Sequence, residues 1–428
     1  MSVSEFGGST ILARAGAGPL APPDAVSPAG VEALELAVAT DLGAVADEWR
    51  RFEKEADGTV FQTWGWHAAW QRHIGGPAGV VPAIVTGRRN GRLLFLMALA
   101  VEPGRIVRRL VWHASGVCDY NAPLLAPEFA RAVGKDRFPA LFARVRDALR
   151  RSGLRFDAVV LEKMPETLGA QPNPFMALAT TLNPSGAYLT RLGRDWDSFY
   201  LEKRSSATRR RDRTKRKRLG DIGEVRYVVP AGTDEIVSSM TTLIEQKSRA
   251  FARMGVPNLF ARPGYREFFL DYATGDETRA IAHVSRLDVG DCRAALNFAL
   301  MFRGRYYHVL ASYDGGEVAK FGPGAAHLHE LMRHAIEHGC TEFDFTIGDE
   351  PYKRDWSDTE LALRDHRSAA TAIGFAAALP GRAAARAKRI VKQTPFLWKM
   401  AVALRTALAR LRGHGKPAAI AAPAAEDE

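Results

Sequence analysis

The polarity of the chain alternates with a period of two over residues 341–347, TEFDFTI, where apolar side chains flank an acid and a threonine. This period predicts a β-strand with one buried face. The strand runs into Gly348, two acids and a Tyr-Lys pair. Because binding groups gather at the carboxyl ends of strands in α/β sheets, residues 348–353 form a candidate ligand-binding loop. A buried strand followed by a solvated turn is the competing interpretation, since Gly-Asp-Glu-Pro also favours a turn.

Hydrophobic periodicity predicts further strands and helices in both halves of the chain. Strands are expected over residues 34–39, 80–86, 92–101, 106–112, 156–162, 188–191, 225–229, 279–287, 292–302 and 306–313. Helices are expected over residues 42–56, 64–70, 138–151, 196–219, 234–254, 265–273 and 325–338. Asn90-Gly91 lies between two of these strands and favours a hairpin turn there.

The two halves of the chain end alike. Residues 140–163 and residues 326–350 both read as a helix, a glycine, the pair Phe-Asp and a strand. This similarity is suggestive of a duplication. Only the second copy continues into a polar loop, so we expect the shared part to be scaffold and the loop to carry the chemistry.

The net charge of +11 is confined to two segments. Residues 203–218 carry +9 and residues 381–416 carry +10, which leaves −8 for the rest of the chain. The first segment has no interleaved aromatic residues for base stacking, so a solvated or anion-facing helix is favoured over nucleic-acid binding. The second segment alternates basic and apolar residues, which suits an anionic membrane surface. A helix packed on the protein or on a partner is equally consistent with that alternation.

Gly322-Pro323-Gly324 lies between a predicted strand and a predicted helix. Backbone amides at such a helix start can hold a phosphate, and Lys320 just upstream would add a positive charge. A plain tight turn is the alternative. The Walker phosphate loop, the dinucleotide fingerprint and the serine-hydrolase elbow are all missing from the sequence, so ATP hydrolysis, classical dinucleotide binding and serine hydrolysis are not expected.

Histidines and acids form no evident metal site in the sequence. His327, Glu330, His334 and His338 share one flank of a predicted helix, but no second element supplies ligands, so we expect a solvated face and no metal. The three cysteines are far apart and lack metal-ligand spacing, which favours a reducing compartment. With no secretory signal and no apolar run of roughly 20 residues, the chain is expected in the cytoplasm.

Several of these motifs occur in the order of a known family. The aromatic segment 61–70 precedes a hairpin, the Asp119-Tyr120 loop, the basic helix, EQKSRAFARM, Gly322-Pro323-Gly324 and GDEPYK. This order resembles the bacterial GNAT-like acetyltransferases linked to cellulose and exopolysaccharide synthesis, which are similar to the Fem-type aminoacyl transferases. The resemblance covers residues 34–358. It implies an α/β fold of two tandem GNAT-like units with mixed sheets.

The resemblance also implies a donor site. An acyl-CoA, with acetyl-CoA as the first choice, would lie where the strands 306–313 and 341–347 splay apart. Gly322 and Gly324 would hold its pyrophosphate at the helix start, and Lys320 is a further candidate cofactor-binding residue. The chain departs from the standard GNAT pattern here, because that pattern has a longer Gly-rich segment beginning with Gln or Arg. Many relatives also have a serine where Gly322 stands.

Acyl transfer needs a group that takes a proton from the acceptor and a group that stabilises the departing thiolate. Asp344 and Asp349 are the candidate bases and Tyr352 is the candidate acid. Lys353 is the candidate for binding a carboxylate, a phosphate or the developing oxyanion. If Asp344 follows the alternation of its strand, it is buried with a structural hydrogen bond instead.

The sequence thus predicts an acyltransferase acting on an amino or hydroxyl group of a sugar, lipid precursor or amino-acid compound, in exopolysaccharide or envelope biosynthesis. A Fem-type transferase that uses aminoacyl-tRNA, with residues 203–218 as docking helix, and a non-catalytic module of a membrane-bound polysaccharide complex are the alternatives. The expected divisions are a disordered segment 1–30, a first GNAT-like unit 31–187, a second 188–365, and a basic tail 366–428. Within that tail, residues 381–416 would contact the inner face of the membrane.

Overall fold

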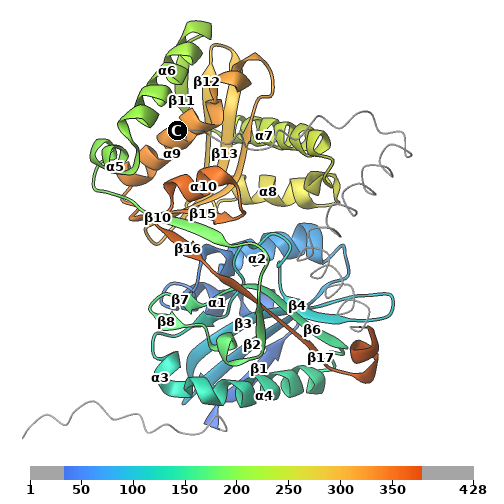
Figure 1. The fold of residues 1–428 in the computed structure, drawn as a ribbon. Helices are drawn as coiled ribbons and strands as arrows, with labels where there is room; N and C mark the ends of the chain where they lie inside the picture. Colours follow the sequence, from blue (N-terminus) through green and yellow to red (C-terminus); the bar gives the residue numbers. More distant parts are fainter. Residues whose placement is uncertain (1–32, 378–428) are drawn as a thin grey trace, which may run out of the picture.

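The computed structural model describes residues 33–377, so the predicted disordered segment 1–30 and the basic segment 381–416 lie outside the described residues. Two mixed sheets occupy the upper and lower halves of Figure 1, each packed against helices. The predicted fold class, an α/β protein of two units with mixed sheets, is confirmed.

The first sheet is built mainly from the N-terminal half of the chain. Its strand order is β1 (Glu35–Ala39), β2 (Val81–Arg89), β3 (Arg92–Glu102), β4 (Arg109–Trp112), β6 (Ala158–Pro165), β17 (Leu363–Ala369) and β9 (Thr180–Leu182), with β5 (Leu124–Leu125) beside β3. The helices of this half are α1 (Ala46–Phe52), α2 (Trp64–Trp70), α3 (Phe129–Val133) and α4 (Phe138–Arg151), and a small hairpin pairs β7 (Thr167–Leu168) with β8 (Gln171–Pro172). In Figure 1, α4 lies below this sheet and α2 lies above it, facing the second unit.

The second sheet forms the scaffold of the C-terminal half. Its order is β11 (Val225–Val228), β12 (Ala282–Val289), β13 (Cys292–Phe302), β14 (Arg305–Tyr313), β15 (Glu342–Ile347), β10 (Ala187–Arg191) and β16 (Thr359–Leu361). On one face lie α7 (Thr233–Met254) and α8 (Tyr265–Thr274); on the other lie α5 (Trp196–Lys203), α6 (Ser206–Ile222) and α9 (Pro323–Glu337). The short helix α10 (Pro351–Trp356) follows β15.

The two units are joined by a strand near the end of the described chain. After β16 in the second sheet, the chain returns to the first sheet as β17, which pairs antiparallel with both β6 and β9. The sequence-based division at residue 365 falls inside this strand. Because β17 takes its hydrogen bonds from the first sheet, residues 363–369 belong structurally to the N-terminal unit.

β14 and β15 pair for only three residues before they separate. The parallel register runs from Arg305 with Glu342 to Tyr307 with Asp344 and then stops. An irregularity on each strand accompanies the separation, because the β13–β14 register shifts at β14 residue 309 and the β10–β15 register shifts at β15 residue 345. The predicted splay of these two strands is therefore confirmed.

Two other sequence-based expectations need correction. Residues 351–356 form α10 rather than remaining in an extended loop, because Pro351 starts a helical turn after Glu350. The flank of α9 that carries His327 and Glu330 is not solvated. His327 is 2% exposed beside Ser285 of β12, and Glu330 is 7% exposed because Arg216 of α6 covers it.

Candidate active site

A cavity of about 560 Å³ opens where β14 and β15 separate. Its walls come from β14, β15, α7, α9, α10 and the junction between α5 and α6. Asp119, from the loop after β4 in the first unit, reaches into the same cavity. The site is thus built largely by the second unit and completed by one loop of the first.

The start of α9 lies at one end of this cavity. Gly322 is the residue before the helix and has a φ of +65°, a left-handed conformation that glycine adopts at low cost. Gly324 lines the cavity, so its own N–H at the start of α9 lies close to it. Pro323 has no N–H, and the N–H groups of Ala325 and Ala326 donate to the Gly322 carbonyl. Lys215 of α6 approaches the same turn, since a Cβ on Gly322 would lie 3.9 Å from Lys215 Nζ. The predicted residue Lys320 instead points to Glu317, at 3.6 Å, and does not line the cavity.

His308 marks the opposite end, next to the point where the strands part. Asn297 Nδ2 donates to the Leu310 carbonyl and to His308 Nδ1, both at 2.9 Å, while Asn297 Oδ1 accepts from Tyr306. A carbonyl oxygen can only accept, so the amide nitrogen of Asn297 must face this way and His308 Nδ1 must be the acceptor. Burial lowers the pKa of His308 to about 3. The ring is therefore neutral at pH 7, and its proton is on Nε2.

Asp119 is the carboxylate that sequence reasoning missed. It is partly exposed to the cavity and faces the Thr346 hydroxyl, Lys163 and Lys353. Thr346 has a φ of +59° and Lys163 a φ of +57°, which is rare for residues other than glycine. Both sit at irregular points of the equivalent strands β15 and β6. The only signal in the sequence was the Asp119-Tyr120 loop itself, whose proximity to the second unit no local pattern reveals.

Two of the four predicted catalytic residues, Tyr352 and Lys353, line the cavity from α10. Lys353 is 5% exposed, donates to the Ile347 carbonyl at 2.7 Å and pairs with Glu350 at 3.1 Å. Gly348 has a φ of +137°, a backbone conformation that favours glycine over residues with a side chain. Burial and the nearby Glu350 raise the pKa of Tyr352, which keeps its hydroxyl protonated.

The other two predicted residues lie outside the cavity wall. Asp344 is fully buried and accepts from the Tyr120 hydroxyl at 2.6 Å and from the Thr346 N–H at 2.8 Å, with Arg305 at 3.4 Å. These are the structural hydrogen bonds that strand alternation led us to expect. Asp349 points away from the cavity, toward Tyr188 at 3.4 Å.

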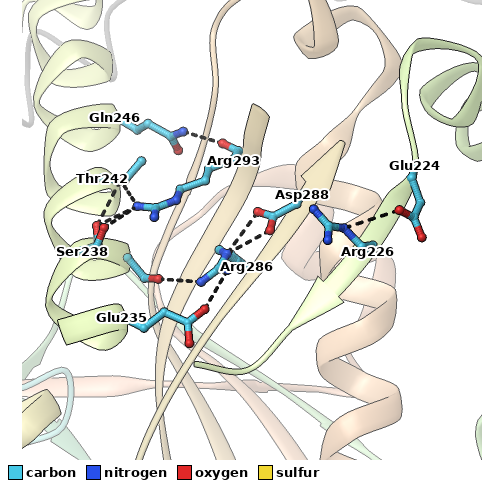
Figure 2. A network of polar contacts seen from close by, with 10 residues as sticks. Glu224, Arg226, Glu235, Ser238, Thr242, Gln246, Arg286, Asp288 and Arg293 are labelled. Carbon is cyan, nitrogen blue, oxygen red and sulfur yellow. Dashed lines mark hydrogen bonds and ion pairs between the residues drawn. The ribbon is translucent and has the colours of Figure 1, made fainter. Parts of the chain in front are cut away.

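Polar contacts fasten α7 to the sheet beside the cavity, as Figure 2 shows. Arg293 of β13 donates to the Ser238 carbonyl at 3.0 Å and to Thr242 Oγ1 at 2.8 Å. Gln246 donates back to the Arg293 carbonyl at 2.9 Å. The next residue along the helix, Lys247, lines the cavity. The two helix turns that lead up to Lys247 are therefore anchored to the sheet.

The basic helix α6 presents most of its charge to solvent. Arg210, Arg211, Arg213 and Lys217 are exposed, whereas Arg216 pairs with Glu330 at 2.6 Å. Within residues 33–377, no group of histidines, cysteines and acids is arranged to hold a metal ion. None of the helices formed by these residues is long and apolar enough to cross a bilayer.

Comparison with known proteins finds solved structures with a similar fold and a family model that matches part of the second unit. The chain is similar in structure to FemX, with 12% identity and a TM-score of 0.53 over 77% of this chain and 96% of FemX. A conserved protein of unknown function from Bacteroides thetaiotaomicron VPI-5482 gives 11% identity and a TM-score of 0.51, over 77% of this chain and 99% of that one. No curated protein sequence matches significantly. The family model for the acetyltransferase (GNAT) domain matches residues 206–354, so the second unit contains a GNAT-like acetyltransferase domain.

Proposed function

We propose that the protein is an acyltransferase that moves an acyl group from an acyl-CoA thioester to an amino or hydroxyl group of a second substrate. The observation that carries this proposal is the separation of β14 and β15, which opens a cavity of about 560 Å³ onto the start of α9. The match of residues 206–354 to the acetyltransferase (GNAT) domain supports the same reaction class.

The two ends of the cavity suit the two ends of such a donor. The Gly324 N–H, the positive end of the α9 dipole and the Lys215 ammonium offer positive charge to a pyrophosphate. From Tyr313 to His308, β14 runs five residues along the cavity, which is about 16 Å of extended strand. An extended arm can lie along this edge, where β14 has no partner strand. The thioester would then sit near His308.

The chemistry at that end falls to residues of both units. As the acceptor attacks the thioester carbon, its proton passes to Asp119, the new C–N or C–O bond forms and the C–S bond breaks. Tyr352 is protonated and lines the same cavity, so it can give its proton to the departing thiolate. Lys353 is held by the Ile347 carbonyl and Glu350, and it keeps α10 in place under the site.

Calorimetry with acetyl-CoA and longer acyl-CoAs tests the donor. Lys215→Gln should weaken binding roughly three- to fivefold, because it removes one charge-assisted contact to the pyrophosphate. Lys217→Gln, two residues along the same exposed helix, is the matched control and should leave the affinity unchanged. Absence of heat change with every acyl-CoA, or an equal effect of the two variants, would contradict the donor site.

The exposed arginines of α6 favour one competing donor, an aminoacyl-tRNA. In that case, replacing Arg210, Arg211, Arg213 and Arg218 with glutamine should abolish retention of tRNA in a gel-shift assay at low salt, because each phosphate contact adds to affinity. If the wild-type protein retains no tRNA while it binds acyl-CoA, this alternative is excluded. We also propose that the acylated acceptor belongs to exopolysaccharide or envelope synthesis. Identifying the acceptor tests this part of the proposal.

A further inference from the structure

The inner end of the cavity holds an ammonium group without a partner among the described residues. Lys247 of α7 lines the cavity, yet no residue within 33–377 offers its Nζ a hydrogen-bond acceptor or an ion pair. The ammonium lies over the Phe251 ring, whose centre is 5.3 Å from Nζ. The acid whose charge acts on Lys247, Glu350, is already paired with Lys353 at 3.1 Å. A partly desolvated cation of this kind favours a ligand that brings a negative charge.

A second donor lies at the same end. His308 is 6% exposed, lines the cavity and carries its proton on Nε2, because Asn297 occupies Nδ1. No described residue accepts a hydrogen bond from Nε2. The two groups are close enough for the Lys247 charge to act on the His308 ring. The Lys247 ammonium and the His308 Nε2–H therefore both offer hydrogen-bond donors to a ligand, and neither offers an acceptor.

Charge balance selects the kind of anion. Lys353 pairs with Glu350, and Lys163 faces Asp119, so among residues 33–377 Lys247 is the lysine at this end of the cavity that has no carboxylate of its own. A monoanion with two acceptor oxygens matches one ammonium and one N–H donor. A phosphate dianion would leave a negative charge unpaired in a partly buried site, which costs free energy.

We propose that the acceptor substrate carries a carboxylate, and that Lys247 and His308 bind this carboxylate beside the thioester. That this ligand is the acceptor rests on the proposed acyl transfer, whereas the carboxylate site itself does not. This assignment transfers to Lys247 the anion-binding role that the sequence suggested for Lys353. It restricts the second substrate to amines or alcohols that bear a carboxyl group, such as amino acids or sugar acids.

Calorimetry with minimal probes tests the site without knowing the acceptor. Sodium propionate should bind the wild-type protein saturably, in the millimolar range expected for so small a ligand. Propionamide has the same shape without the charge and should bind at least tenfold more weakly. Lys247→Met should weaken propionate binding at least tenfold, and Lys217→Met, on the exposed face of α6, should not change it. If the methionine variant melts early, Lys247→Gln serves in its place.

Nuclear magnetic resonance on protein labelled with 15N-histidine locates the probe. Propionate should shift the Nε2 signal of His308, which is identified by its loss in His308→Gln. Four results would overturn the inference: no saturable propionate binding, equal binding of propionamide, full binding by both Lys247 variants, or tighter binding of inorganic phosphate. Propionate binding without any acyl-CoA binding would support the carboxylate site and contradict the acyl-CoA donor. Acyl-CoA binding without propionate binding would support the donor and contradict the carboxylate site.

Discussion

Asp119→Asn is expected to lower the rate of acyl transfer by about 10²- to 10⁴-fold, the usual contribution of a general base. The amide has the shape of the carboxylate but cannot accept the acceptor's proton. Affinity for acyl-CoA should stay within about twofold, because the start of α9 is unchanged. The rate is measured as thiol release from acyl-CoA in the presence of a carboxylate-bearing amine, and the affinity by calorimetry.

The matched control is Asp349→Asn. Asp349 is a predicted base that points out of the cavity toward Tyr188, so its loss should change the rate less than about threefold. The reverse pattern, with Asp349→Asn inactive and Asp119→Asn active, would restore the sequence-based choice of base and remove Asp119 from the mechanism.

The pH dependence gives an independent check on Asp119. Burial raises the pKa of its carboxyl, while Lys163, the Thr346 hydroxyl and Lys353 act in the opposite direction. A base works only when it is deprotonated, so the wild-type rate should fall as the pH drops through this raised pKa. The acid limb should be missing from the residual activity of Asp119→Asn. An acid limb of unchanged position in the variant would assign that limb to another group.

Regular periodicity made most of the fold predictable. The helix expected over residues 138–151 and the strand expected over residues 292–302 agree at both ends with α4 and β13. Both elements are long. One face of α4 and most of β13 are buried, so the apolar pattern of each is strong. The hairpin turn at Asn90-Gly91 is present, with positive φ at both residues, as its chemistry requires.

The features that sequence reasoning missed depend on contacts between distant segments. β17 is recognisable only through its pairing with β6, some two hundred residues earlier in the chain. The flank of α9 was predicted to face solvent because it carries polar residues such as Glu330. In the structure, Arg216 of α6 forms an ion pair with Glu330 and covers it. Asp119 reaches the cavity across the boundary between units. Local patterns report which face of an element is apolar, and they do not report which polar group another element will cover.

The same limit explains the ambiguity over Asp344. The alternation of its strand predicted a buried carboxylate, whereas its acidic side chain suggested a catalytic base. Local pattern alone could not decide between these two interpretations. In the structure, the Tyr120 hydroxyl of the first unit donates a hydrogen bond to Asp344 of the second unit, so this carboxylate helps to hold the two units together. Its function in the fold can therefore be tested through stability rather than through activity.

Asp344→Ala is expected to lower the free energy of unfolding by about 3–5 kcal/mol. The substitution leaves the Tyr120 hydroxyl and the Thr346 N–H without their buried acceptor and removes one of the two carboxylates beside Arg305, which keeps Glu342 at 2.6 Å. Asp344→Asn should cost less, because the amide oxygen can still accept from Tyr120 and Thr346. Urea unfolding at pH 7 measures both variants. Equal small losses would show that water replaces the carboxylate and that these contacts add little.

Comparing the wild-type protein with Asp344→Asn at different pH values then separates desolvation from ion pairing. Burial raises the pKa of Asp344 to about 6, against the pull of Arg305. The unfolded chain has the ordinary aspartate pKa, so it releases this proton first as the pH rises, and the wild-type protein loses stability between about pH 4 and 6. The loss should approach about 2–3 kcal/mol relative to the asparagine variant, which has no proton to release there. A wild-type protein that instead gains stability over this range would mean that the ion pair with Arg305 outweighs burial, and that Asp344 is held as a charge rather than as a buried acid.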